Sequence, residues 1–385
     1  KNTGVGRGVL VENTTANNNT GIGYFALVNN ITGADNTAVG ANALDSNTTG
    51  SDNNALGRNA LGANTTGSNN VAVGTQALDA NTTASNNTAI GHAALLANTT
   101  GTQNVAVGAN ALDANTTASS NTAIGFNALT ANTTATQVTA LGNKTLESNT
   151  TGDGNTGLGS NALQNNTTAS NNTAVGKEAL GANTTGGNNT TIGMNSMTSC
   201  TTGQSNTCLG VSAGVNITTG TNNVFLGKDA GGGSSPSGAI TGGSNNVCLG
   251  DNNIARLFCA DTSISSSDSR DKTDVASFNI GLAWINALRP VTYRWDRRTW
   301  YGTDEEPYGT PDGSKKRQRL HIGFLAQEAL EVEKANGYGS SNDDSLVCNL
   351  TDDGMSYGMK YERLVPILVN AIKELSAKVT ALEAG

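Results

Sequence analysis

The chain has 385 residues, a net charge of −8, 48 glycines and only 16 aromatic residues. This composition is too poor in large apolar side chains to fill one ordinary globular core. The acidic balance, with no basic stripe along the chain, argues against a surface that binds nucleic acid or an anionic membrane.

The large residues are unevenly distributed along the chain. Twelve of the sixteen aromatic residues lie from Phe258 onward, together with all three tryptophans and four of the five prolines. Two physically different parts are therefore expected to join near that residue. We predict a repeat shaft over residues 1–250, a junction over 251–266 and a separate domain over 267–385.

Glycine recurs every 17 residues from Gly6 to Gly227, and the phase returns at Gly250 after an insertion of six residues. Fixed self-similarity of this kind is typical of solenoids and fibres. Each unit holds two short apolar stretches separated by Asn, Thr and Gly, which favour turns. The repeat therefore predicts two strands and two turns per unit, stacked as an all-β parallel β-roll or solenoid.

The core of such a shaft would be thin. Each coil offers about four apolar side chains, half of them Ala, which is little for a rod standing alone. Closed three-fold association of identical chains would bury equivalent faces of parallel rods, so we expect a homotrimer. The pattern NTAVGxNAL resembles the head repeats of trimeric autotransporter adhesins and the repeats of many phage tail fibres. A triple β-spiral, with strands exchanged around the axis, is the structural alternative.

An asparagine stands seven residues after each repeat glycine from Asn13 to Asn183, and each begins an Asn-x-Thr sequence. This row is either a ladder of glycosylation sites or a stacked turn whose amides hydrogen-bond from coil to coil. We favour the stacked turn. A fibre assembled in the cytoplasm would not meet the oligosaccharide machinery.

Other motifs of the repeats receive structural interpretations. The GVG, GIG and GLG sequences lack the following helix of a nucleotide-binding loop, so they are interpreted as turn glycines. Asp45, Asp79 and Asp113 are sporadic and lack a calcium-repeat pattern, so neither a metal nor a cofactor is expected. The five cysteines have no metal-ligand spacing, and Cys208 and Cys248 are read as small buried hydrophobes. The sequence has no apolar stretch of about 18 residues, so membrane insertion is not predicted.

An α+β pattern replaces the repeat after Arg256. An amphipathic stretch ends at 284–288, a strand is predicted over 291–295, and a strand-to-helix run follows over 321–334. The polar loop between them, 296–319, ends in the basic run KKRQR. We interpret this run as a solvated hairpin and not as a nucleic-acid patch, because the protein is acidic.

The last segment, 361–382, is the clearest helix of the chain. Its apolar residues follow the spacing of a heptad seam and are Leu368, Ile372, Leu375, Val379 and Leu382. One helix cannot bury such a seam alone. It therefore predicts packing against other copies of the chain or against the body of the domain.

Four motifs in the C-terminal part are more specific, and they occur in the order SDSRDK (267–272), LRPVTYRW (288–295), HIGFLAQE (321–328) and the ending from Lys360. Together they resemble the intramolecular chaperone of endosialidase-type tail spikes and fibres, the peptidase family S74. The resemblance implies a domain that trimerises, guides the folding of the attached β-structured fibre and then cuts itself away.

The resemblance also implies a Ser/Lys dyad at Ser267 and Lys272. A serine hydroxyl is a weak nucleophile until a base removes its proton, and a lysine of lowered pKa can act as this base. The family cuts immediately before the serine, so Ser267 would attack the carbonyl carbon of Ser266 and water would open the resulting ester. A serine followed five residues later by a lysine is by itself common in solvated linkers. The other three motifs favour the catalytic interpretation.

Three neighbouring residues receive weaker assignments. Asp268 and Arg270 are expected to position the turn, and His321 is expected to assist. Asp271 stands where the family usually has an apolar residue. A carboxylate there could pair with Lys272 and hold it protonated, which would slow cleavage.

The sequence thus predicts a structural homotrimeric fibre, namely a viral tail fibre or tail spike assembled in the host cytoplasm and carried on the virion. A host-surface receptor or glycan would be its partner outside the trimer, and self-cleavage its one enzymatic activity. A cellular surface adhesin or appendage with a retained C-terminal cap is the alternative. A carbohydrate-degrading enzyme ranks last, because the repeats have almost no clustered acids or aromatic residues.

Overall fold

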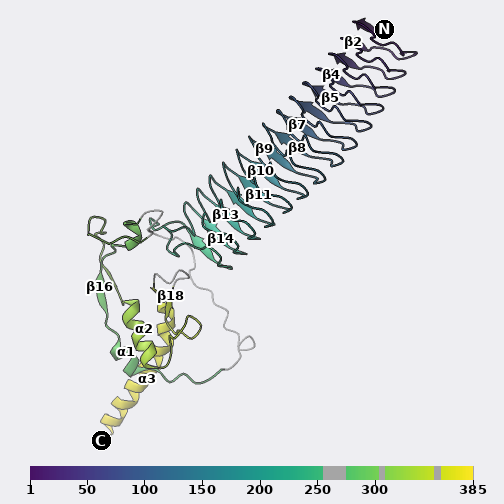
Figure 1. The fold of residues 1–385 in the computed structure, drawn as a ribbon. Coiled ribbons are helices and arrows are strands. Elements are labelled where there is room, and N and C mark those ends of the chain that lie inside the picture. The colour runs from purple at the N-terminus through teal and green to yellow at the C-terminus, as the bar shows by residue number, and fades with distance from the viewer. Residues whose placement is uncertain (255–274, 303–307, 351–356, 385) are drawn as a thin grey trace. The chain divides into compact units, whose positions relative to one another are not determined.

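The computed structural model describes residues 1–254, 275–302, 308–350 and 357–384 (Figure 1). The chain divides into two compact units, Lys1–Asp251 and Asn252–Gly385. The first unit holds the repeats, and the second holds the three α-helices and two small antiparallel sheets.

The repeat unit is a parallel β-solenoid with one three-residue strand per coil (Figure 1). All fifteen strands lie in one parallel sheet in chain order, so a single chain builds the rod and the triple β-spiral is excluded. Pairing is in register, with Ala38 of one coil opposite Ala55 of the next. The strands are β1 (Thr3–Val5), β2 (Thr20–Ile22), β3 (Thr37–Val39), β4 (Asn54–Leu56), β5 (Val71–Val73), β6 (Thr88–Ile90), β7 (Val105–Val107), β8 (Thr122–Ile124), β9 (Thr139–Leu141), β10 (Thr156–Leu158), β11 (Thr173–Val175), β12 (Thr190–Ile192), β13 (Thr207–Leu209), β14 (Val224–Leu226) and β15 (Val247–Leu249).

The apolar Ala-Leu stretch of each unit forms a turn and not a strand, so the prediction of two strands per unit is wrong. In one coil, Asn42 and Leu44 adopt left-handed φ values of 58° and 51°. The neighbouring side chains of Ala43 and Leu44 are both fully buried. A strand would send two consecutive side chains to opposite faces, whereas the left-handed backbone turns both inward. The Leu44 N–H donates to Ala60 O of the next coil at 3.0 Å, so the turn's backbone is hydrogen-bonded between coils.

The core consists of identical small side chains stacked from coil to coil. Each regular coil buries the Ala at the middle of its strand and the Ala-Leu pair of its turn, as at Ala38, Ala43 and Leu44. Cys208 and Cys248 are buried at the strand-centre position with free thiols, as predicted. Because the side chains are small, each coil gains little from apolar burial and depends on its neighbours.

The predicted asparagine row is a buried hydrogen-bonded ladder. The Asn98 amide is fully buried, and its Nδ2 donates to Asn81 Oδ1 of the preceding coil at 3.0 Å and to Gly101 O at 2.9 Å. An attached glycan would require the nitrogen that makes both bonds. The folded coil therefore confirms the stacked turn and leaves this row inaccessible to glycosylation.

A second buried asparagine row, six residues after the first, was not predicted. The Asn104 backbone N–H donates to Asn87 Oδ1 at 2.9 Å, and Asn104 Nδ2 donates to Ala118 O at 2.9 Å. The side chain thus bridges the backbones of neighbouring coils. The two rows together satisfy polar backbone groups in the part of each coil between the Ala-Leu turn and the next strand.

The repeat glycine is required by close approach between coils. Gly40 has φ of 137°, and a Cβ atom there would lie 2.5 Å from Gly57 O. Any other residue would both strain the backbone and push the coils apart. The second glycine of GVG and of GIG is such a turn glycine, as predicted, whereas the first glycine, Gly4 or Gly21, is the middle residue of a strand.

The shaft changes character in its last coils. The first asparagine ladder ends at Asn183, and the next two coils carry Cys200 and Ile217 at that position, both buried. Larger apolar residues enter the core there, including Met197 and Phe225. At this end of the rod, apolar packing replaces the first asparagine ladder, and the second asparagine row continues.

The second unit has the predicted α+β character and ends in a long helix (Figure 1). Its small core includes Trp284, Ala329, Val347, Leu364 and Ile367. Strands β16 and β17 pair antiparallel, as do β18 and β19. The elements are α1 (Leu282–Ala287), β16 (Val291–Tyr293), η2 (Arg298–Trp300), β17 (His321–Gly323), α2 (Ala326–Ala335), β18 (Cys348–Leu350), β19 (Tyr357–Met359), η3 (Tyr361–Arg363) and α3 (Leu364–Glu383). Within the ranges described above, no helix has both the length and the apolarity to cross a membrane.

Replacing Asn115 by Ala tests the first ladder. Asn115 Nδ2 donates to Asn98 Oδ1 at 2.8 Å and to Ala118 O at 3.0 Å, and its own Oδ1 accepts from Asn132. The variant leaves three buried polar groups short of a partner. We expect the free energy of unfolding to fall by about 1–3 kcal/mol in denaturant titrations. Asn165→Ala is the matched control, because Asn165 is exposed; an equal loss in both variants would contradict the role of the ladder.

Candidate functional site

The predicted cleavage site lies outside the residues that the structure describes. The segment 255–274 contains Ser266, Ser267, Asp268, Arg270, Asp271 and Lys272. The Ser/Lys dyad and the scissile bond between Ser266 and Ser267 therefore stay predictions. The structure instead shows how the chain immediately after this segment is held.

The chain that follows the predicted dyad is tied to the C-terminal helix. Asn370 Nδ2 on α3 donates to Phe278 O at 2.6 Å and to Ile280 O at 3.2 Å. Four residues further along α3, Glu374 Oε2 accepts the backbone N–H of Leu282 at 3.2 Å. Two polar side chains of α3 thus fix the segment entering α1. The geometry couples the C-terminal helix to the chain nearest the cleavage region.

His321 lies among aromatic residues of the β16–β17 pair. It stands opposite Tyr293 in register, and the two rings stack with centroids 5.6 Å apart. The ring of Trp295 approaches edge-on at 6.3 Å. These contacts give the imidazole a packed position in the small sheet. Its accessory role in cleavage stays a prediction, because the dyad is not described.

The motifs that carried the family resemblance meet one another in the fold. Arg289 of LRPVTYRW pairs with Glu328 of HIGFLAQE, with Nε 3.1 Å from Oε2. This pairing raises the pKa of Arg289 and lowers the pKa of Glu328. Both side chains are solvent-exposed, so the pair contributes little to stability and mainly fixes orientation.

A second contact joins HIGFLAQE to the C-terminal motif. The Phe324 N–H donates to Tyr361 Oη at 3.1 Å. A Cβ atom at Gly323 would lie 2.5 Å from that oxygen, so the glycine makes room for the tyrosine. Three of the four motifs therefore have an observed structural role.

Glu333 holds a loop of the second unit in place, and the sequence did not predict this role. Its carboxylate is fully buried and accepts four hydrogen bonds. Oε1 accepts from Val347 N at 2.7 Å and Cys348 N at 2.9 Å, and Oε2 accepts from Leu346 N at 3.0 Å and Ser345 Oγ at 2.9 Å. The four donors replace the water that a buried carboxylate loses. One side chain of α2 thus organises the loop entering β18.

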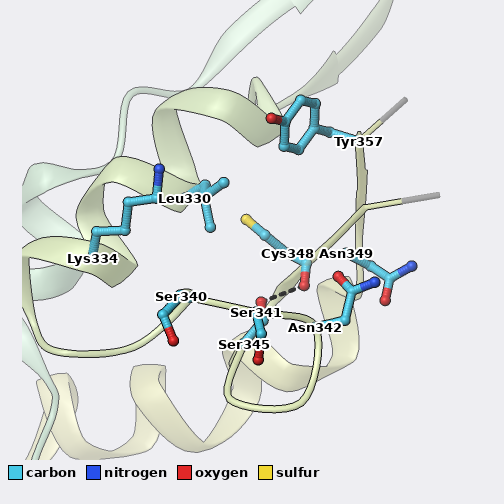
Figure 2. Close-up of a pocket in the computed structure, with 10 residues that line it drawn as sticks. Leu330, Lys334, Ser340, Ser341, Asn342, Ser345, Cys348, Asn349 and Tyr357 are labelled. Atoms are coloured by element: carbon cyan, nitrogen blue, oxygen red, sulfur yellow. Dashed lines mark hydrogen bonds between the residues drawn. The ribbon is translucent and has the colours of Figure 1, made fainter. Parts of the chain in front are cut away.

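A pocket of about 270 Å³ lies between α2 and this loop (Figure 2). Leu330 and Tyr357 line one side, and Ser341 and Asn342 line the other. The only thiol in it belongs to Cys348. Burial, together with the Glu333 carboxylate, raises the pKa of this thiol to about 12, so it stays protonated and is no nucleophile at neutral pH.

The rim of the pocket is held by a second carboxylate. Asp344 Oδ2 accepts from Ser340 Oγ at 2.6 Å, and Asp344 Oδ1 accepts from Ser341 N at 2.7 Å. These bonds, that of the Ser340 hydroxyl first, lower the pKa of Asp344 to about 2. The carboxylate is therefore fully used in fixing the loop. Across the described parts of the chain, no three His, Cys, Asp or Glu residues gather as a metal site would require.

Comparison with known families finds a similarity within the second unit. Residues 267–338 match the Peptidase_S74 family model, described as chaperone of endosialidase. The match begins at the predicted nucleophile Ser267 and spans the first three motifs, so it confirms the resemblance there, while the fourth motif, from Lys360, lies outside it. No curated protein matches the chain. The chain thus has an N-terminal β-solenoid followed by a segment similar to the chaperone of endosialidase.

Replacing Glu333 by Gln tests the scaffold role. The amide nitrogen would face backbone N–H groups, so at least one buried donor would lose its acceptor. We expect the second unit to lose about 2 kcal/mol of unfolding free energy or more. Intrinsic tryptophan fluorescence reports on this unit alone, because all three tryptophans lie in it. Glu331→Gln, an exposed neighbour on the same helix, is the control. Unchanged stability in Glu333→Gln would contradict the assignment.

Proposed function

We propose that this chain forms the shaft and the C-terminal chaperone of a homotrimeric viral tail fibre or tail spike. The observation that carries the proposal is the chaperone-of-endosialidase match at residues 267–338, which follows directly on a β-solenoid of fifteen stacked strands. The solenoid supplies a long, regular and rigid element. The C-terminal domain supplies what a thinly cored rod lacks, namely a means of assembling and folding it.

An apolar row along the shaft supports trimerisation. The third residue of each strand points away from the core, and in a single chain nine of these side chains are 36–51% exposed. Rows of this kind favour burial against a partner. Parallel copies of the same rod would match the row coil for coil. The members of the row are Ile22, Leu56, Ile90, Leu141, Leu158, Ile192, Leu209, Leu226 and Leu249.

The C-terminal helix gives a second, independent support. Leu364, Ile367 and Ala371 of α3 are buried in the domain. The predicted heptad seam falls on a different part of the helix surface, and its members Ile372 and Leu382 are 66% and 82% exposed. A helix that buries one face in its own domain and exposes a heptad seam can pack that seam against other copies.

Self-release is proposed as the last step of assembly. Lys272 removes the proton of the Ser267 hydroxyl, and the oxygen attacks the carbonyl carbon of Ser266. The peptide C–N bond breaks as the Ser267 nitrogen takes up a proton, which leaves an ester between the two residues. Water then hydrolyses the ester, giving a carboxylate on Ser266 and a free Ser267. The reaction needs no cofactor.

The biological setting follows from the same combination. A tail fibre would present the shaft on the virion and use it for attachment to a host-surface receptor or glycan. A cellular surface adhesin with a retained C-terminal cap is the second candidate, favoured by the resemblance of the repeats to trimeric adhesin heads. The sequence of the gene upstream of residue 1 would discriminate between them. A virion-attachment domain favours the fibre, and a signal peptide with an anchor favours the adhesin.

Light scattering tests the trimer, and Ser267→Ala protein is used throughout so that self-cleavage cannot shorten the chain. Three chains of 39.0 kDa give an expected mass of about 117 kDa. The double variant Ile372→Asp/Leu375→Asp places charges on the seam, and we expect it to reduce the mass toward that of one chain. Lys373→Asp, an exposed change between them, should leave the mass unaltered. Uncleaved Ser267→Ala protein that is monomeric would contradict the homotrimer.

Mass spectrometry tests self-cleavage. Wild-type protein is expected to yield fragments 1–266 and 267–385, whereas Ser267→Ala and Lys272→Met stay at full length. Asp271→Leu is expected to cleave faster than wild type, because it removes the carboxylate that would hold Lys272 protonated. A folded wild type that remains at full length under all assembly conditions would show that the protease assignment is wrong.

A further inference from the structure

The last coil of the shaft contains six more residues than the coils before it. The repeat glycines are 17 residues apart up to Gly227, and the next one, Gly250, follows after 23 residues. Strand β15 nevertheless pairs with β14 in the usual register, with Phe225 opposite Cys248. The extra residues therefore leave the sheet undisturbed and lie elsewhere in the coil.

Backbone hydrogen bonds between coils locate the extra residues. Bonding is regular up to Ala230, whose O accepts from Gly214 N of the preceding coil at 2.8 Å. It resumes at Thr241, whose O accepts from Thr218 N at 2.7 Å. The insertion thus falls within residues 231–240, at the corner where other coils pass from the Ala-Leu turn to the first asparagine row. We call this segment the end loop.

The end loop is compact and closed by its own backbone. Ser235 N donates to Gly232 O at 2.9 Å, and Gly238 N donates to Ser235 O at 3.0 Å. At its base, Ile240 N donates to Gly231 O at 3.0 Å. These bonds give the loop a defined shape, although five of its ten residues are glycine or serine without a large side chain to pack.

The end loop reaches the last strand of the sheet. Ser235 Oγ lies 2.7 Å from Sγ of Cys248, the central residue of β15, and Ser237 Oγ lies 3.6 Å from the same sulfur. Ser235 is 1% exposed, although it is a serine in a surface loop. The loop therefore extends from the turn of the coil to the inward side chain of its strand.

The other side of the end loop packs on the apolar core. A Cβ atom at Gly231 would lie 2.6 Å from Phe225 Cε1, so the loop backbone lies directly against this ring. Ile240 and Cys248 are 4% and 6% exposed. Internal coils bury such side chains against the next coil, whereas β15 is the last strand of the sheet in the part of the chain that the structure describes.

We propose that the end loop closes the C-terminal end of the shaft core and takes the place of a following coil. The terminal coil of a solenoid exposes the side chains that an internal coil buries against its neighbour, so terminal repeats need a cover of their own. Here a six-residue insertion in one coil supplies it. A second consequence rests on the proposed self-cleavage. The end loop precedes Ser266, so the released shaft keeps it and its core stays closed.

Deleting residues 233–238 tests the proposal, because the deletion leaves a last coil of 17 residues that keeps the repeat pattern. The experiment uses full-length Ser267→Ala protein and follows alkylation of each cysteine by iodoacetamide with peptide mapping. We expect Cys248 to react faster by about 100-fold or more, because a buried group loses its protection when its cover is removed. Labelling of Cys248 that is no faster than in the parent protein overturns the proposal.

Cys208 is the internal control, because it is fully buried at the same position of β13 and should stay unlabelled. If the deletion exposes Cys208 as well, the shaft has unfolded and two point variants decide. Ser235→Gly removes the side chain that contacts Cys248, and Ser234→Gly changes its exposed neighbour. We expect about tenfold faster labelling of Cys248 in the first and no change in the second. Equal rates in the two variants overturn the proposal.

Self-cleaved wild-type protein tests the consequence for release. We expect Cys248 to be as well protected there as in uncleaved Ser267→Ala protein. Fast labelling in the cleaved protein alone would show that the C-terminal domain covers this end of the shaft, and would overturn the proposal. A wild type that does not cleave contradicts the proposed self-release instead, and the end loop is then judged by the deletion and the point variants.

Discussion

The bond between the buried amide of one coil and the buried amide of the next is the interaction on which the shaft depends. The Asn98 amide donates to Asn81 Oδ1 of the preceding coil and accepts from Asn115 Nδ2 of the following coil, and within its own coil it donates to Gly101 O. A coil that has just one three-residue strand cannot satisfy its polar groups by itself. The coil is therefore stable only as part of a stack, and stability passes along the rod from neighbour to neighbour.

This dependence explains the composition of the repeats. Small side chains such as Ala43 let the coils stack closely, and Gly40 permits the backbone approach at the turn. The same small side chains leave little apolar area to bury in the core, while the outward apolar row along the strands stays partly exposed in a single chain. In the proposed homotrimer, this row would be buried against the other copies of the chain.

The second unit is stabilised by a few polar residues between distant parts of the chain. Glu333 on α2 holds the loop entering β18, and the guanidinium of Arg363 donates to Leu346 O of the same loop at 3.2 Å. Gly323 and Tyr361 join the third and fourth family motifs. In the described part of the domain the motif residues build the scaffold, while the proposed chemistry is confined to the short segment from Ser267 to Lys272.

The sequence by itself determined the parts of this protein in which a residue contacts the equivalent residue of the next repeat. A 17-residue period places every Asn of the first row beside the same Asn of the next coil, so the parallel stack and the amide ladder could be inferred without any structure. The junction, the heptad seam of α3 and the S74 motifs are likewise local patterns. The second asparagine row had the same periodic signal and was overlooked.

Only the tertiary structure decided the features in which unlike and distant residues meet. The Ala43-Leu44 stretch is apolar enough for a strand, but both side chains must point inward, and a left-handed turn achieves this where alternation cannot. Glu333 finds its donors at Val347 and Cys348, and Arg317 finds its ring at Trp300, across chain separations that no repeat encodes. A periodic sequence specifies contacts between equivalent positions, whereas contacts between different positions depend on how the chain folds back on itself.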